Sequence, residues 1–412
     1  MGNTKFNYVM GLISGIALTI LIFVLLVPLG ESGGGGGGVS LPTPAAFNRQ
    51  SADIDWDDFI QKIDQIYNVI GNNFIGDFNT EMAVDMMFRA FVYGANDPYT
   101  SYLDAVSFSN FMTRFSGEFY GIGVTVVADP TDNRILVITP HEGSPACEAG
   151  ILPGDRIVRV NGISVFGDRL DDAVAMMRGE VGTPVDVTVL RNGHGEIDFN
   201  IIRDVIRSET VRGEMLDGDI GYIRITGFDA ITASQFEEIY NRLVAENMQA
   251  LILDVRNNGG GSMDAVIEIA DMIVPQGLIT YTINAHGRRQ DHRSDARQTE
   301  VPLIMLMNGN SASASEVLGG AVQDSGIGYL LGTTSFGKGV IQRFFPLPDG
   351  SAVRVTIARY YTPSGNSIDG EGLVPDFYIE MDQELTNRLV RLDRADDVQL
   401  QEAIRILNEK IQ

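Results

Sequence analysis

Positive charge, histidine and cysteine are all scarce in this sequence of 412 residues. It carries 30 Lys and Arg against 54 Asp and Glu, a formal net charge of −24, and has no basic run. This balance argues against a nucleic-acid binder, which needs a basic face to neutralise phosphates. The single cysteine, Cys147, excludes an intrachain disulfide framework and a thiolate metal cluster. No metal site is expected from the histidines either, because they lie in polar, turn-like segments: His141, His194, His286 and His292.

Lysine is also rare, and arginine supplies nearly all of the positive charge. Only Lys5, Lys62, Lys338 and Lys410 occur. Lys338 therefore stands alone between residues 62 and 410, in an apolar, glycine-rich loop. A buried lysine amine can lose its proton and act as a base near neutral pH, whereas a guanidinium stays charged. Lys338 is thus a candidate general base.

Residues 8–29 form a run of 22 residues without a charge, long enough to cross a hydrocarbon core of ~30 Å as a helix. Lys5 precedes the run and Glu31 follows it, so the positive-inside rule places the body of the chain on the extracytoplasmic side. A cleaved signal peptide is the alternative, but its apolar region is usually shorter and ends in a small-residue cleavage site. We expect residues 1–29 to be a transmembrane signal anchor of a single-pass cell-membrane protein.

The next segments differ in composition. Residues 30–48 contain six consecutive glycines and two prolines, and we expect a flexible linker with a reach of ~25 Å. Residues 49–115 repeat apolar side chains at helical spacing, which predicts an N-terminal helical region. Core packing is the simpler explanation for its methionines and aromatics, and a groove for a partner is the alternative. Residues 386–412 are predicted to form a C-terminal helical segment.

Residues 116–205 consist of short β-branched runs between turn signals, with one helical stretch at 170–177. The succession YGIGV, GSPACEAGILPGDRIVRVNG and DDAVAMMRG resembles a PDZ domain. In such domains, backbone N–H groups of a glycine-rich loop bind the terminal carboxylate of a peptide that adds as a strand. By that resemblance the carboxylate-binding loop comprises Tyr120, Gly121, Ile122, Gly123 and Val124. A tight hairpin is the simpler explanation for YGIGV taken alone.

Residues 206–385 alternate buried-type strands with helices, which predicts an α/β layer architecture. The segment 332–338 nearly spells a phosphate-binding P-loop. However, Gly339 replaces the Ser or Thr that would ligate magnesium, and the residues that follow cannot form the phosphate-capping helix. Nucleotide hydrolysis is therefore not expected.

A general base needs a nucleophile, and the stretch NGNSASASE (308–316) offers three serines between a strand and a predicted helix. Free N–H groups and the positive end of the helix dipole would favour an oxyanion at that point. The structural alternative is that these serines only cap the helix. A histidine base also stays open, since no sequence rule excludes a histidine from reaching Ser313.

The order of the motifs DPYTSYLD, the PDZ-like segment, DVRNNGGG, NSASASE, FGKGVIQ and YYTPSG resembles the C-terminal processing, or tail-specific, proteases. These are Ser/Lys peptidases with an inserted PDZ domain, and the resemblance covers residues 55–410. It implies a multidomain α/β chain with a ClpP/crotonase-like peptidase core. Carried over by motif, Ser313 is the nucleophile, Lys338 the general base and Gln342 the residue that orients the amine.

The resemblance also implies an oxyanion hole made by two backbone N–H groups. Ala314 supplies one and a residue of the glycine run supplies the other, for which Gly260 is the best match. The sequence NNGGG replaces the commoner N-x-P-G-G, which leaves Gly259 open. The role of Glu316, three residues after the serine, also stays open.

The sequence thus predicts a membrane-anchored serine endopeptidase that recognises protein C-terminal tails through its PDZ domain. Its partners would be protein or peptide substrates with exposed C-termini, together with the membrane. No nucleic acid, metal or other cofactor is expected, and a homo-oligomer is left open. The alternative function is a catalytically silent PDZ scaffold that only binds tails.

Overall fold

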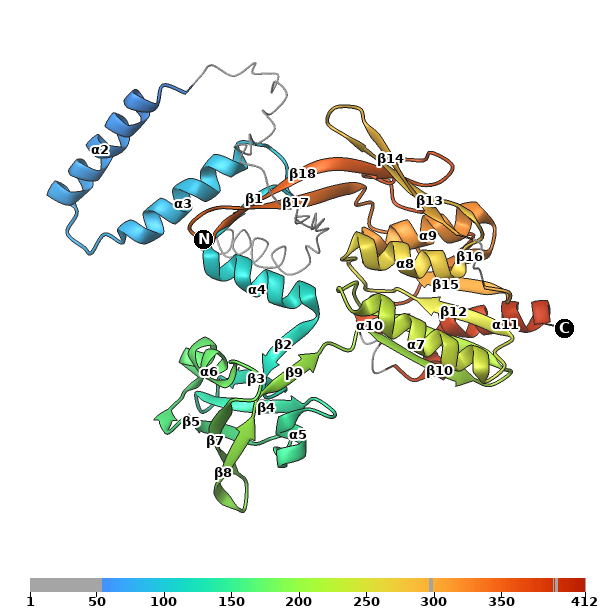
Figure 1. Cartoon of the computed structure of the whole chain (residues 1–412), viewed down its shortest axis with the longest axis horizontal. Helices are drawn as coiled ribbons and strands as arrows, with labels where there is room; N and C mark the ends of the chain where they lie inside the picture. Colours follow the sequence, from blue (N-terminus) through green and yellow to red (C-terminus); the bar gives the residue numbers. More distant parts are fainter. Residues whose placement is uncertain (1–53, 296–298, 388, 390–391, 412) are drawn as a thin grey trace, which may run out of the picture. The chain divides into compact units, whose positions relative to one another are not determined.

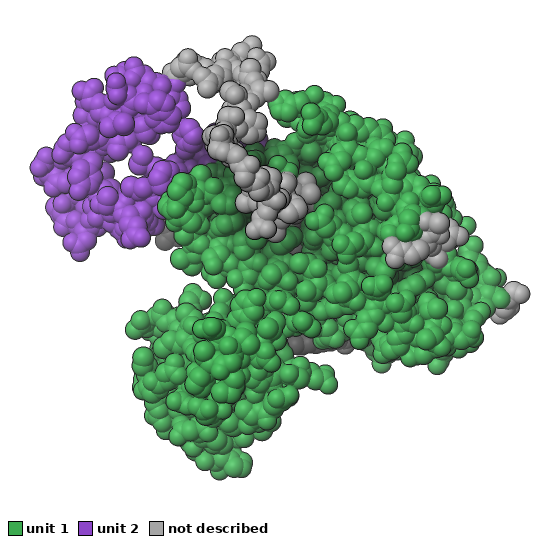
Figure 2. All heavy atoms as spheres, viewed as in Figure 1, with its two compact units in different colours: residues 1–25, 103–412 green, residues 26–102 purple. Residues whose placement is uncertain are grey.

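The computed structural model describes residues 54–295, 299–387, 389 and 392–411 (Figure 1). The predicted anchor (1–29) and linker (30–48) lie outside these residues. Within the described ranges, no helix is both long and apolar enough to span a bilayer. The described chain divides into two compact units between residues 102 and 103 (Figure 2).

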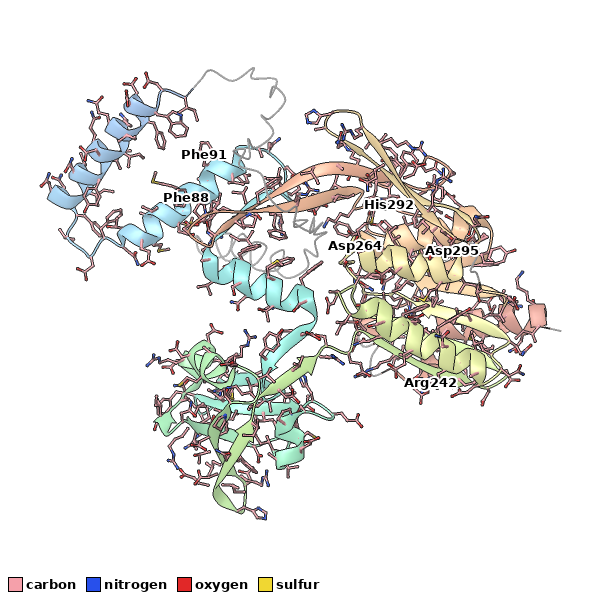
Figure 3. All side chains as sticks on the ribbon, in the orientation of Figure 1. Phe88, Phe91, Arg242, Asp264, His292 and Asp295 are labelled. Atoms are coloured by element: carbon pink, nitrogen blue, oxygen red, sulfur yellow. The ribbon has the colours of Figure 1, made fainter. Side chains whose placement is uncertain are left out.

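The smaller unit contains helices α2 (Trp56–Asn73) and α3 (Thr80–Tyr93), and strand β1 (Ser101–Leu103) begins at its end. Asp55 and Asn79 begin the two helices, because their side chains accept hydrogen bonds from free N–H groups of the first turns. Neither helix has a buried residue, and Phe88 and Phe91 of α3 remain exposed (Figure 3). Within the described residues this unit therefore has no buried core, and core packing of its apolar stripes stays a prediction.

The larger unit begins with α4 (Ala105–Ser116) and continues into an antiparallel β domain. The elements of this domain are β2 (Glu118–Gly121), β3 (Val124–Asp129), β4 (Arg134–Pro140), α5 (Pro145–Ala149), β5 (Arg156–Val160), β6 (Ile163–Ser164), η1 (Gly167–Arg169), α6 (Leu170–Met177), β7 (Pro184–Arg191), β8 (Gly195–Ile202) and β9 (Asp204–Arg207). Its main sheet has the order β3-β4-β5-β7-β8, and β2 pairs with β9. Ile135, Ile157 and Val187 lie in its buried core.

The rest of the larger unit is an α/β core. It comprises β10 (Val211–Leu216), β11 (Ile220–Ile225), α7 (Thr232–Ala245), β12 (Ala250–Asp254), α8 (Met263–Ile273), β13 (Gly277–Asn284), β14 (Arg289–Ser294), β15 (Leu303–Met307), α9 (Ala314–Ser325), β16 (Gly328–Gly332), β17 (Val340–Pro346), β18 (Ala352–Tyr361), β19 (Phe377–Tyr378), α10 (Gln383–Asn387), η2 (Arg394–Asp396) and α11 (Val398–Ile411). One sheet has the order β10-β11-β12-β15-β16-β19, parallel except at β10. A second, antiparallel sheet contains β17, β18, β13 and β14.

Helices cover both faces of the first sheet, so its central strands are apolar throughout (Figure 1). Leu251 and Leu253 point toward α7, α8 and α9, whereas Ile252 packs in the cluster that contains α11. Parallel strands end at the same edge of a sheet, and this is where α/β proteins place their sites. The loops after β12 and β15 therefore meet, and they carry the glycine run and the three serines.

Candidate active site

Ser313 lies in the turn between β15 and α9, with a backbone strained for a non-glycine residue (φ 59°, ψ −113°). Such a conformation costs of order 1–3 kcal/mol and persists only where the surroundings impose it. The side chain of Glu316 imposes it here by accepting a hydrogen bond from the Ser313 backbone N–H, at 2.7 Å. The Ser313 Oγ is buried and has no hydrogen-bond partner among the residues that the structure describes.

The neighbouring serines both have structural roles. The Ser311 hydroxyl donates to the backbone oxygen of Val255 at 2.8 Å, and the Ser315 hydroxyl donates to that of Asn258 at 2.9 Å. Ser313 is therefore the serine of the three whose hydroxyl makes no such bond. Ser313 stands at the N-cap position of α9, where Glu316 bonds back to its N–H, but its own Oγ has no hydrogen-bond partner in the described chain.

The buried carboxylate of Glu316 joins the serine turn to the loop that carries Lys338. One oxygen accepts from the backbone N–H groups of Ser313 (2.7 Å) and Lys338 (2.9 Å), and the other from Gly337 N (2.7 Å) and Ser335 Oγ (2.5 Å). The first two distances place the backbone nitrogens of Ser313 and Lys338 no more than 5.6 Å apart. Burial raises the pKa of Glu316, and the four donors oppose that rise.

A second bridge comes from Tyr360 of β18, whose hydroxyl donates to the backbone oxygens of Ser313 (3.3 Å) and Lys338. Lys338 itself is buried. Gln342 follows at a bulge in β17, and its Nε2 donates to Thr356 Oγ1 at 3.2 Å. In the described part of the chain, the buried Gln342 Oε1 has no donor. The structure thus brings the three predicted catalytic residues to two neighbouring loops and a strand.

The glycine run packs directly against the serine turn. Gly260 has φ +101°, and a Cβ there would lie 2.7 Å from Ser313 Cβ and 2.9 Å from Ala314 N. Only glycine therefore fits this close approach. Ala314 opens α9, so its N–H has no acceptor within the helix. The Gly260 N–H, in contrast, donates to Asn258 Oδ1 at 2.9 Å, a bond that the sequence did not indicate.

The loop after β11 supports the glycine run from behind. Phe228 donates its N–H to Gly260 O at 3.1 Å and accepts from Ser262 N at 2.6 Å. Asp229 follows in the same loop, where burial raises the pKa of its carboxyl to about 6. Burial therefore disfavours the ionised form of Asp229, and its charge lowers the stability of the folded chain above about pH 6.

Asp229→Asn is expected to stabilise the chain at pH 8 by about 2 kcal/mol and to have no effect at pH 4. The pKa of Asp229 is higher in the folded chain than in the unfolded chain, because the ionised carboxylate is disfavoured by burial. Stability is therefore full below about pH 4, where the carboxyl is neutral in both states, and it is lost as pH rises through 6. Urea unfolding at both pH values measures the difference, with Asp217→Asn as an exposed control. The same stability difference at pH 4 and pH 8 would show that the Asp229 charge is not the cause.

The histidine alternative gains no support from the geometry. Hydrogen bonds link His141 to Thr125 Oγ1 and His194 to the backbone oxygen of Asn192. His292 lies on β14 with Asp264 on neighbouring α8, and burial lowers the pKa of this histidine (Figure 3). Nowhere in the described ranges does a histidine donate to or accept from Ser313.

A second site lies in the β domain, between β3 and α6. A cavity of about 200 Å³ there is lined by all five residues of the predicted carboxylate-binding loop (120–124), together with Val174, Met177 and Arg178. Gly123 has φ +77°, and a Cβ would lie 2.3 Å from Ser144 Cβ. β3 is an edge strand of its sheet, so an extended peptide can pair with it.

An α/β core with a strained serine at a helix N-terminus, joined to a PDZ-like groove, is the arrangement of a PDZ-containing serine peptidase. Comparison with known proteins agrees, because the profile of "Peptidase family S41" matches residues 219–379 and that of a PDZ domain matches residues 136–191. Both the predicted PDZ domain and the predicted α/β peptidase core are thereby confirmed.

Relatives with curated names extend the match over most of the chain. The carboxy-terminal-processing protease of Bartonella bacilliformis is 36% identical over 355 residues, covering 76% of this chain and 80% of the relative. Carboxy-terminal processing protease CtpA of Bacillus subtilis is 34% identical, covering 79% and 70%. The Synechocystis carboxyl-terminal-processing protease is also 34% identical, covering 76% and 74%. The chain belongs to the C-terminal processing proteases of peptidase family S41, and it is a serine-type peptidase.

Proposed function

We propose that the chain is a membrane-anchored endopeptidase that uses Ser313 as nucleophile and Lys338 as general base. One observation carries the proposal: the buried Ser313 hydroxyl has no hydrogen-bond partner in the described chain. Glu316 accepts hydrogen bonds from the backbone N–H groups of both Ser313 and Lys338, so it links the serine turn to the lysine loop. Burial favours a neutral amine, which a base requires.

In the proposed reaction, neutral Lys338 takes the proton from Ser313 Oγ as that oxygen attacks a peptide carbonyl. Ala314 N–H stabilises the oxyanion from the start of α9, where the helix dipole adds to the effect. Gln342 Oε1, which has no donor in the described structure, would accept a hydrogen bond from the Lys338 amine in the proposed reaction and so orient it. Collapse of the tetrahedral intermediate breaks the peptide C–N bond, and protonated Lys338 gives its proton to the leaving amine. Neutral Lys338 then takes a proton from the water that attacks the acyl-enzyme, and it returns this proton to Ser313 Oγ as the carboxylic acid product leaves.

The second oxyanion donor comes from the glycine run in this proposal. Gly260 has the position for it, next to Ser313 Cβ and Ala314 N. Because its N–H donates to Asn258 Oδ1, it must exchange that bond for the oxyanion, or Gly259 N–H must serve instead. Glu316 and Tyr360 hold the serine turn and the lysine loop together.

A catalytically silent PDZ scaffold is the alternative function. Cleavage of casein by the intact chain, lost in Ser313→Ala, supports the peptidase. Tail binding without any cleavage by the intact chain would establish the scaffold.

We further propose that the PDZ groove binds substrate C-termini through backbone N–H groups of the loop 120–124. The cavity and the open edge of β3 support this proposal. Amidation of a peptide tail should weaken its binding to Ser313→Ala protein about tenfold to a hundredfold, because charged hydrogen bonds to the carboxylate are lost.

Fluorescence anisotropy with paired free-acid and amidated peptides measures this effect. A peptide acetylated at its N-terminus is the matched control and should bind unchanged. Equal affinity of the free-acid and amidated tails would rule out carboxylate recognition by this loop.

The membrane part of the proposal rests on the uncharged run 8–29 and its flanking charges. We place the PDZ domain at 116–205 and the peptidase core at 206–385, on the extracytoplasmic side. Protease treatment of intact spheroplasts tests this orientation, because digestion of the body from outside is expected. A body that is protected until the cells are lysed would contradict the orientation.

A further inference from the structure

A buried ionic cluster lies directly before the glycine run. The Arg256 guanidinium is 1% exposed and is held between two carboxylates. Nε and Nη2 donate to the two oxygens of Asp254, at 3.0 and 2.7 Å. Nη1 and Nη2 donate to the two oxygens of Asp397, at 2.8 and 2.7 Å, and Nη1 also donates to Gln399 Oε1 at 3.0 Å. All five N–H groups of the guanidinium are therefore used.

The two carboxylates come from distant parts of the sequence. Asp254 ends β12, whereas Asp397 lies between η2 and α11, 141 residues after Arg256. Asp397 also accepts a hydrogen bond from Leu400 N at 3.0 Å, so it caps α11. Gln399 is fixed in turn, since its Nε2 donates to Ile379 O at 2.7 Å. The C-terminal segment thus presents preorganised acceptors to Arg256.

The residues on both sides of Arg256 hold the serine turn. Val255 O accepts the Ser311 hydroxyl at 2.8 Å. Asn258 O accepts the Ala312 N–H at 3.0 Å and the Ser315 hydroxyl at 2.9 Å. Any shift of the backbone at Arg256 would therefore move the nucleophile turn and the glycine run together.

We propose that Asp397 is a positioning residue for the peptidase reaction, acting through Arg256 on the oxyanion-binding loops. This inference rests on the proposed function of Ser313. Asp397 and Gln399, and not the C-terminal segment as a whole, then help to hold the oxyanion-binding loops in place. Buried charges that lose one partner are strongly disfavoured, so Arg256 would move when Asp397 is replaced. Displacements of about 1 Å at a site are enough to slow a reaction a hundredfold.

Two variants separate this role from helix capping. Asp397→Asn keeps the cap and one acceptor oxygen, and Asp397→Ser keeps only the cap. We expect kcat to fall about tenfold in the first and about a hundredfold in the second, with KM within twofold of wild type. Asp393→Asn is the matched control, since Asp393 caps η2 through Ala395 N without touching Arg256, and it should keep kcat.

A peptide aldehyde provides the second readout, because its adduct with Ser313 resembles the tetrahedral intermediate. Its affinity should fall in parallel with kcat in both Asp397 variants, while binding of an uncleaved tail peptide to the PDZ groove stays constant. Full kcat and aldehyde affinity in folded Asp397→Ser would overturn the proposal. So would a loss of kcat matched by Asp393→Asn or by equal loss of tail binding, because the cause would then be general instability.

Failure of the proposed function would give a different result. Wild-type protein would then show no Ser313-dependent hydrolysis, and aldehyde affinity would be the same in Ser313→Ala. Intact Ser313-dependent activity that is indifferent to Asp397 overturns only the inference about the C-terminal segment.

Discussion

Ser313→Ala is expected to lower kcat for peptide hydrolysis by about 10⁴-fold or more, without loss of stability. The hydroxyl is the proposed nucleophile, and a covalent mechanism cannot proceed without it. It makes no hydrogen bond in the described structure, so its removal leaves no buried group unpaired. A fluorogenic peptide assay and urea unfolding measure the two quantities on the same preparation.

Ser311→Ala and Ser315→Ala are the matched controls. Each would leave a buried backbone oxygen without its serine donor, which costs about 1–2 kcal/mol of stability. Both should retain measurable activity. Ser313→Ala is therefore expected to lose activity and keep its stability, whereas Ser311→Ala and Ser315→Ala are expected to lose stability and retain activity. Equal loss of activity in all three would refute the assignment of Ser313 as the single nucleophile.

Lys338→Arg is expected to be inactive, with kcat lowered by about 10³-fold or more, although the positive charge is kept. A guanidinium does not lose its proton in proteins, so it cannot accept the serine proton. It is also larger and planar, in a loop where Lys338 is 3% exposed. Steady-state kinetics on the same fluorogenic peptide give the comparison.

Lys410→Arg is the control for the chemical change itself. Lys410 lies on α11, where its Nζ lies 4.6 Å from the centre of the Tyr329 ring, a contact that arginine also makes. Wild-type activity is expected there. Wild-type activity in Lys338→Arg would exclude Lys338 as the general base.

The sequence predicted the parts of the site that local patterns encode. The serine turn, the lysine loop and the PDZ loop each lie within one short motif, and the structure has them in the predicted elements. The rarity of lysine also identified Lys338 before any motif did. The helical stretch predicted at 170–177 has the limits of α6, and the uninterrupted apolar run of β15 is typical of a strand that is buried on both faces.

What the sequence could not supply are contacts between distant segments. The Glu316 carboxylate meets Lys338 N across 22 residues, and the Tyr360 hydroxyl meets Ser313 O across 47. Glu316 stands at the third position of its helix, where a capping carboxylate is common, so its second function leaves no local signal. The Asn258 Oδ1 accepts a hydrogen bond from the Gly260 N–H, and the spacing of these residues in the sequence does not determine the side-chain rotamer that this bond requires.

The most direct test of the Ser/Lys proposal is mass spectrometry of the acyl-enzyme. The chain is mixed with a peptidyl p-nitrophenyl ester, whose rapid acylation lets the intermediate accumulate, and is quenched in acid after one turnover. The expected result is one peptidyl group on the tryptic peptide that contains Ser313, absent in Ser313→Ala and strongly slowed in Lys338→Arg. Peptidyl transfer to another residue, with hydrolysis retained in Ser313→Ala, would contradict the proposed mechanism.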